Sequence, residues 1–193
     1  MANVGLSRAM IVAIVAVISV ALIAAVVFFY LSGDGGNGGG EETFHEGDFV
    51  EYGTFYFYAG YDPGEPSGYV RYTITDIDDE WITVQATYLN PARIELMTQT
   101  MHWPANATGF AYAASTVDDI TYTVSDLGTD TVDTEWGEIS AHHYQYNYES
   151  LGNTYTVDIW TRGGFYLLQK TTSDVDPQAA IILTNTNIAS IYS

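Results

Sequence analysis

The chain has 193 residues, with 24 acidic side chains against 5 basic ones, so its formal net charge is −19 at neutral pH, and it contains no cysteine. Nucleic acid is excluded as a partner because a polyanion cannot neutralise phosphates. Disulfide scaffolds, thiolate metal sites and a lipidated N-terminal cysteine are excluded because each needs a cysteine. With 47% hydrophobic and 15% aromatic residues, the chain is too apolar to be a disordered acidic tail.

An uncharged apolar run comes first in the chain, over residues 10–31. As a helix rising about 1.5 Å per residue it would reach about 33 Å, enough to cross a bilayer. We therefore predict a transmembrane helix over residues 10–32 and a cytoplasmic tail over residues 1–9, because Arg8 precedes the run whereas acidic residues follow it. A cleaved secretory signal is the alternative, but its apolar core would be shorter and would end at a small-residue site.

A glycine-rich segment, residues 33–43, follows the apolar run. Its glycines have no reason to pack, so we predict a flexible linker between the membrane and an extracytoplasmic domain over residues 44–193. All acidic residues except Asp34 and all basic residues except Arg8 lie after residue 40. The negative charge therefore belongs to the outer domain, as on proteins kept soluble in salty surroundings, where counterions screen self-repulsion.

Residues 44–193 show the period-two alternation of strands and no convincing helical spacing. Ile82, Val84 and Ala86 alternate with threonine and glutamine, and the segments 70–75 and 154–159 alternate in the same way. Turn residues recur every 8 to 15 positions, which leaves too little room for the crossover helices of a parallel sheet. We predict an all-β domain of about nine or ten strands, an antiparallel curved sheet that forms a half-barrel or a sandwich. Residues 179–191 either close the sheet as its last strand or form a short helix against it, and we favour the strand because of the β-branched isoleucine and threonine content.

Two segments carry a resemblance to known proteins. The first contains Gly47, Asp48, Phe49 and Tyr52; the second contains Trp160, Gly163, Gly164, Leu167, Leu168 and Lys170. With the N-terminal anchor and the linker, they resemble a loose group of archaeal and bacterial extracytoplasmic β domains that look like the half-barrels of LolA-like lipoprotein carriers. The resemblance implies an apolar concave face that holds a lipid-like ligand, and it implies no catalytic residue.

The order of an apolar N-terminal helix and a β domain is also similar to archaeal type IV pilin-like subunits. Cleavage after Gly5 would give a mature protein that starts at Leu6. The pattern lacks a basic residue before Gly5, and the glycine linker interrupts the helix where pilins continue into the head domain. A pilin-like or other structural subunit of the cell envelope is therefore the alternative to a binding protein.

Histidines and carboxylates are the candidate metal ligands. Adjacent strand residues point to opposite faces, so His142 and His143 cannot bind one ion together without a bulge, whereas His102 combined with one of them stays an open alternative. The acidic segment 76–80 offers the oxygen ligands that calcium prefers, but its spacing fits no calcium loop. We interpret it as a solvated turn and predict no metal and no cofactor.

Catalytic patterns are also missing, since the chain has no cysteine nucleophile, no G-x-S-x-G elbow and no phosphate-binding loop on a strand. Carboxylate pairs for glycoside cleavage arise by chance in so acidic a chain. We therefore predict no catalytic residue, and an anchored hydrolase ranks third, after a binding protein and an envelope subunit.

Tyrosine is the most distinctive residue type, with 16 copies. Tyr144, Tyr146 and Tyr148 alternate onto one face of a predicted strand together with His142. Such amphipathic rings commonly serve as half-exposed packing of a sheet, which is the first interpretation. The functional alternative is a binding face for a glycan, a peptide or an apolar ligand, because the rings offer a large contact area at a low entropic cost, and its candidate residues are these three tyrosines and Trp160. Asn106 begins an Asn-Ala-Thr glycosylation sequon on a predicted outward-facing loop.

Overall fold

The computed structural model describes residues 44–57, 65–104, 122–150, 153–162, 165–173 and 178–192. The predicted cytoplasmic tail, the transmembrane helix (residues 10–32), the whole linker (residues 33–43) and the sequon at Asn106 lie outside these residues. Within the described part of the chain, no helix combines the length and the apolar character needed to span a membrane.

Nine strands make up the described domain. They are β1 (Phe49–Phe57), β2 (Gly68–Ile77), β3 (Trp81–Leu89), β4 (Glu95–Pro104), β5 (Tyr122–Thr134), β6 (Gly137–Ser150), β7 (Asn153–Arg162), β8 (Phe165–Ser173) and β9 (Gln178–Thr186). They form one antiparallel sheet in the order β4-β3-β2-β1-β9-β8-β7-β6-β5. A short 3-10 helix, η1 (Ala189–Ile191), ends the described chain.

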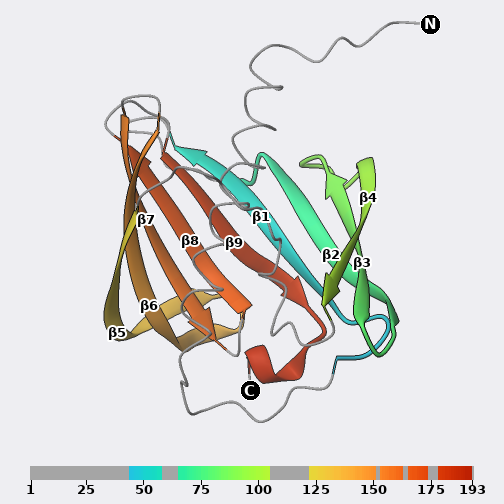
Figure 1. Ribbon diagram of the computed structural model, residues 1–193. Helices are drawn as coiled ribbons and strands as arrows, with labels where there is room; N and C mark the ends of the chain where they lie inside the picture. Colours follow the sequence, from blue (N-terminus) through green and yellow to red (C-terminus); the bar gives the residue numbers. More distant parts are fainter. Residues whose placement is uncertain are drawn as a thin grey trace, which may run out of the picture.

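The sheet consists of two meanders joined at its centre, where the first strand pairs with the last (Figure 1). Strands β1 to β4 run to one edge of the sheet and strands β9 back to β5 run to the other. The sheet curves strongly, and β5 comes close to β8 although β6 and β7 separate them in the sheet. The prediction of an antiparallel curved sheet is confirmed, and the sandwich alternative is not the architecture observed.

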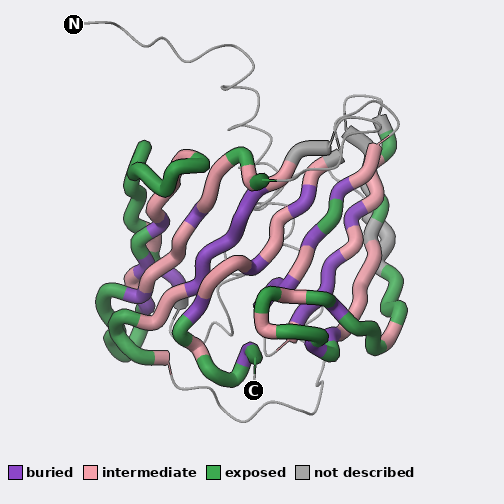
Figure 2. The backbone as a smooth tube through the Cα atoms, turned by 180° about the vertical axis from the view of Figure 1, so that it is seen from behind, coloured by how far each residue is buried: buried purple, intermediate pink, exposed green. Residues whose placement is uncertain are grey.

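Side-chain alternation defines two faces of this sheet. The face that carries Val50, Val84, Ile159 and Leu183 is called the inner face, and the opposite face is called the outer face. Many apolar residues of the inner face are buried and belong to one hydrophobic core cluster. The predicted alternation in β3 is confirmed, since Ile82, Val84 and Ala86 are buried. Figure 2 shows buried residues along the central strands and exposed ones at the β4 edge and in the turns.

The strands are connected by turns that the polar residues of the sequence stabilise. Between β2 and β3, one carboxylate oxygen of Asp78 accepts hydrogen bonds from the backbone nitrogens of Glu80 (2.8 Å) and Trp81 (2.6 Å). These bonds hold the pKa of Asp78 below its usual value. Between β5 and β6, Gly137 has a φ of +99°, a conformation that residues with a Cβ rarely adopt.

The prediction of a strand over residues 179–191 is right as far as Thr186 and wrong beyond it. The side chain of Asn187 ends the strand by accepting a hydrogen bond from the Phe49 backbone nitrogen (2.8 Å) and donating one to the Gly47 carbonyl oxygen (3.1 Å). The Thr186 hydroxyl accepts a hydrogen bond from the Ile188 nitrogen (3.1 Å). Together these bonds turn the chain, so that η1 buries Ile191 against the core.

Candidate ligand-binding face

The inner face is an apolar surface that extends across most of the sheet. Its members are large hydrophobic side chains from six strands, most of them less than 7% exposed. They are Val50, Tyr52, Val70, Ile74, Ile82, Val84, Val157, Ile159, Phe165, Leu167 and Leu183. Tyr52 and Tyr72 contact each other edge to face, with ring centroids 6.3 Å apart. Burial raises the pKa of both phenols, so they are neutral at pH 7 and serve as packing groups with a hydroxyl.

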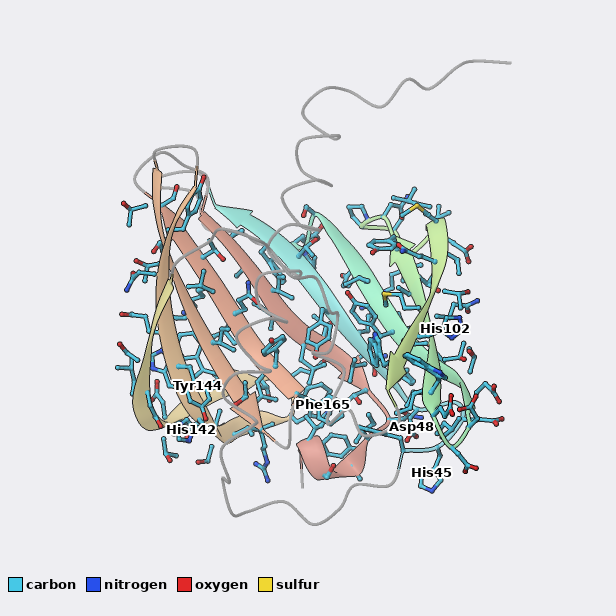
Figure 3. All side chains as sticks on the ribbon, viewed as in Figure 1. His45, Asp48, His102, His142, Tyr144 and Phe165 are labelled. Atoms are coloured by element: carbon cyan, nitrogen blue, oxygen red, sulfur yellow. The ribbon has the colours of Figure 1, made fainter. Side chains whose placement is uncertain are left out.

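Aromatic residues close the lower end of the inner face. Phe165 lies in front of the sheet there (Figure 3), and Phe44, from the segment that precedes β1, packs against it edge to face at 6.1 Å. Nearby, Tyr192 stacks on Trp136 at a centroid distance of 5.6 Å. These contacts attach the start of the described chain to β8 and its end to the β5–β6 turn.

The three candidate tyrosines occupy alternate positions of β6. The register pairs Tyr144 with Ile159, Tyr146 with Val157 and Tyr148 with Tyr155, and residues paired directly across strands lie on the same face. The side chains of Tyr146 and Tyr148 lie outside the described part of the structure.

Tyr144 itself is half-buried, and its ring stacks on the His142 ring at a centroid distance of 4.4 Å; both residues are labelled at the lower left of Figure 3. Burial raises the pKa of the Tyr144 phenol, and the nearby Asp126 carboxylate adds to the effect. Asp126 also lies 2.6 Å from His142 Nε2. Tyr144 therefore lies beside a polar pair near the β5 edge of the sheet.

The fourth candidate, Trp160, lies on the outer face, because the register pairs it with His143 and not with a tyrosine. Its ring stacks on the His143 ring at 4.1 Å, its Nε1 donates to Asp130 Oδ2 at 3.0 Å, and Lys170 Nζ lies 5.4 Å from its centroid. His143 Nε2 also lies 3.0 Å from Asp158 Oδ1. Trp160 is thus part of a packed polar cluster and does not line the inner face with the tyrosines.

The histidines do not converge. His142 and His143 point to opposite faces, as predicted, and His102 lies on β4, at the far edge of the sheet from β6 (Figure 3). Among the described residues, no group of three or more histidine and carboxylate side chains is arranged to hold a metal ion. The open alternative of a site that combines His102 with His142 or His143 is therefore wrong, because whole strands separate these residues.

Two neighbouring polar residues of β8 interrupt the apolar inner face, and the sequence analysis did not single them out. Gln169 and Thr171, on β8, are 1% and 7% exposed. Within the described structure, neither the Gln169 amide nitrogen nor the Thr171 hydroxyl oxygen has a hydrogen-bond partner. A buried polar group without a partner costs about 1–3 kcal/mol. A signal was present in the sequence, since Lys170 must face solvent and its two neighbours must then point inward.

The outer face contains a buried carboxylate that the sequence analysis also missed. Glu51, on β1, has a fully buried side chain. Arg71 donates to its Oε2 from Nε at 3.0 Å and from Nη2 at 2.7 Å, and Arg93 donates to its Oε1. Each arginine also lies over an aromatic ring: Arg71 is 5.0 Å from the Phe49 centroid and Arg93 is 4.1 Å from that of Tyr69. The cluster ties β1, β2 and the β3–β4 turn together.

No protein-family model matches the chain, and no curated protein matches it. Among solved structures, the chain is similar to a protein from Bacteroides fragilis described as an exported protein with a YMCC-like fold. The two chains share 11% sequence identity with a TM-score of 0.48, over 74% of this chain and 96% of that chain.

Proposed function

We propose that this protein is a non-catalytic binding protein whose β domain holds an elongated apolar ligand, such as a lipid, along the inner face of the sheet. Residues 10–32 anchor it to the membrane, and the domain after the linker lies outside. The LolA-like resemblance agrees with this proposal, because such half-barrels carry lipid-like ligands on the concave side.

One observation carries the proposal, namely the continuous apolar inner face of a single curved sheet. In many antiparallel sheets one face is apolar and packs on a second layer, whereas the other face is polar and exposed to water. Here β1–β3 and β7–β9 all direct large apolar side chains to the same concave side. Concave apolar surfaces with a few polar groups are typical of sites for small apolar molecules.

The titratable groups of the inner face support a binding role over catalysis. Tyr52 and Tyr72 have pKa values raised by burial, so neither supplies a base at neutral pH. The histidine–carboxylate pairs of the described residues lie in the segment before β1 (His45 with Asp48), on the outer face (His143 with Asp158) or at the β5 edge (His142 with Asp126), and not at the apolar centre of the inner face.

The test is uptake of the fluorescent probe N-phenyl-1-naphthylamine by the full chain held in amphipol. We expect saturable fluorescence enhancement for the wild type and its loss in Val157→Trp, which fills the inner face. Thr154→Trp is the matched control, because Thr154 lies on the same strand, on the outer face and exposed. Equal enhancement by both variants, each checked for folding by circular dichroism, would refute binding at the inner face. Sedimentation of the protein as filaments would instead support the envelope-subunit alternative.

A further inference from the structure

Gln169 and Thr171 occupy successive inner positions of β8, in the middle of the apolar face. Gln169 pairs with Ile159 on one side and Ile181 on the other. Thr171 pairs with Val157 and Ala179. The two polar side chains therefore form a small patch with apolar neighbours on both flanking strands.

Both side chains are more than nine-tenths buried, and within the described structure their polar atoms are left without partners. Buried polar atoms in folded proteins are almost always paired, so an unpaired amide and an unpaired hydroxyl side by side indicate a missing partner. An amide nitrogen only donates, whereas a hydroxyl both donates and accepts. The missing partner is thus a hydrogen-bond acceptor.

Charge decides what kind of acceptor fits. The outer domain has four basic side chains. Arg71 and Arg93 both bind Glu51 on the outer face, and Lys170 is exposed and points outward beside Gln169. Arg162 pairs with Phe165 at the start of β8, four residues before Gln169. A carboxylate or phosphate at Gln169 would be buried among apolar side chains in a strongly acidic protein, which is costly.

We infer that the ligand of the inner face is a lipid with a neutral carbonyl group, which accepts hydrogen bonds from the Gln169 amide and the Thr171 hydroxyl while its chain lies on the apolar residues. An acyl ester and a lipid ketone share this chemistry. The inference rests on the proposed function, because it identifies the ligand class of the same face.

The test is a competition between three ligands with chains of similar length. The full chain in mild detergent is incubated with equal amounts of methyl myristate, myristate and tetradecane, and the bound ligands are quantified by mass spectrometry after gel filtration. We expect the wild type to retain the ester about tenfold over the alkane, as one or two hydrogen bonds allow, and to retain the ester over the carboxylate. A parallel incubation contains a long-chain methyl ketone in place of the ester. The amount of ketone retained, compared with the amount of ester retained, shows which of the two kinds of carbonyl the face prefers.

Gln169→Leu should abolish the preference for ester over alkane and leave alkane retention unchanged. The shift of the ester carbonyl stretching band on binding, measured with a carbonyl-13C ester, should also disappear. Gln85→Leu is the matched control, since Gln85 is exposed on the outer face of β3. Thr171→Val provides a second variant if Gln169→Leu does not fold.

The outcomes separate the two claims. An unchanged ester-to-alkane ratio in Gln169→Leu, or tighter retention of myristate than of its ester by the wild type, would overturn the neutral-carbonyl inference while leaving an apolar binding face intact. Failure of the wild type to retain any of the ligands would overturn the proposed function itself.

Discussion

The buried carboxylate of Glu51 provides the sharpest test of how the sheet is held together. Replacing Arg71 by leucine removes the two hydrogen bonds, at 3.0 Å and 2.7 Å, that reach Oε2, and leaves Arg93 as the remaining cationic partner of the carboxylate. Hydrogen bonds to a buried charge contribute about 1.5–3 kcal/mol, and breaking a fully buried ion pair costs about 3–5 kcal/mol. Because the Arg71 side chain is 39% exposed, solvent screens part of this interaction. We expect a loss of about 2–3 kcal/mol.

The assay is urea unfolding of the purified chain, followed by tryptophan fluorescence. Arg71→Leu should lower the midpoint without changing the slope, because the surface exposed on unfolding is the same. The double variant Glu51→Leu, Arg71→Leu should recover part of the loss, since it leaves no carboxylate in the cluster. A loss below about 0.5 kcal/mol in the single variant, the size expected of a surface ion pair, would refute the conclusion that this carboxylate depends on Arg71.

Three further predictions concern pH and salt. The pKa of Asp78 is lowered by the backbone N–H groups it binds, so its contribution to stability is present above about pH 4 and is lost as the pH falls further. In Asp78→Asn the urea midpoint should therefore depend less on pH between pH 5 and pH 3 than it does in the wild type. Parallel curves of midpoint against pH for the variant and the wild type would contradict this. Burial raises the pKa of Tyr72, so its contribution to stability should be complete below about pH 10 and fall above it as the phenol of the unfolded chain ionises. In an alkaline titration, the free energy of unfolding should decline less steeply for Tyr72→Phe than for the wild type. An identical decline in the two proteins would contradict this prediction. Because the net charge is −19, the thermal midpoint should rise from low to molar salt, and a constant midpoint would exclude a role for screened self-repulsion.

Short-range patterns in the sequence predicted the architecture well. In β3 and β7 the alternation of apolar and polar residues identifies the buried face directly, since Ile82, Val84, Val157 and Ile159 are all buried. The antiparallel order follows from closely spaced turns, which leave no room for crossover helices. The end of β9 was missed because Asn187 bonds to Gly47 and Phe49, which are far away in the sequence.

The site was harder to predict because it depends on register between strands. Trp160 and the β6 tyrosines look equivalent in the sequence, yet the pairing of β6 with β7 places Trp160 opposite His143 and Tyr144 opposite Ile159. A shift of one residue would exchange these faces. The Glu51 cluster depends likewise on the β3–β4 turn, which brings Arg93 to a residue 42 positions earlier in the chain.

The most direct test of a lipid-binding inner face is the native mass spectrum of the full chain, purified under mild conditions from the cells that produce it. We expect a population with one additional mass, which organic extraction releases as a neutral carbonyl-containing lipid, and we expect Val157→Trp to lack it while Thr154→Trp retains it. A wild-type chain that carries no lipid, or carries as much as the Val157→Trp variant does, would contradict ligand binding at the inner face.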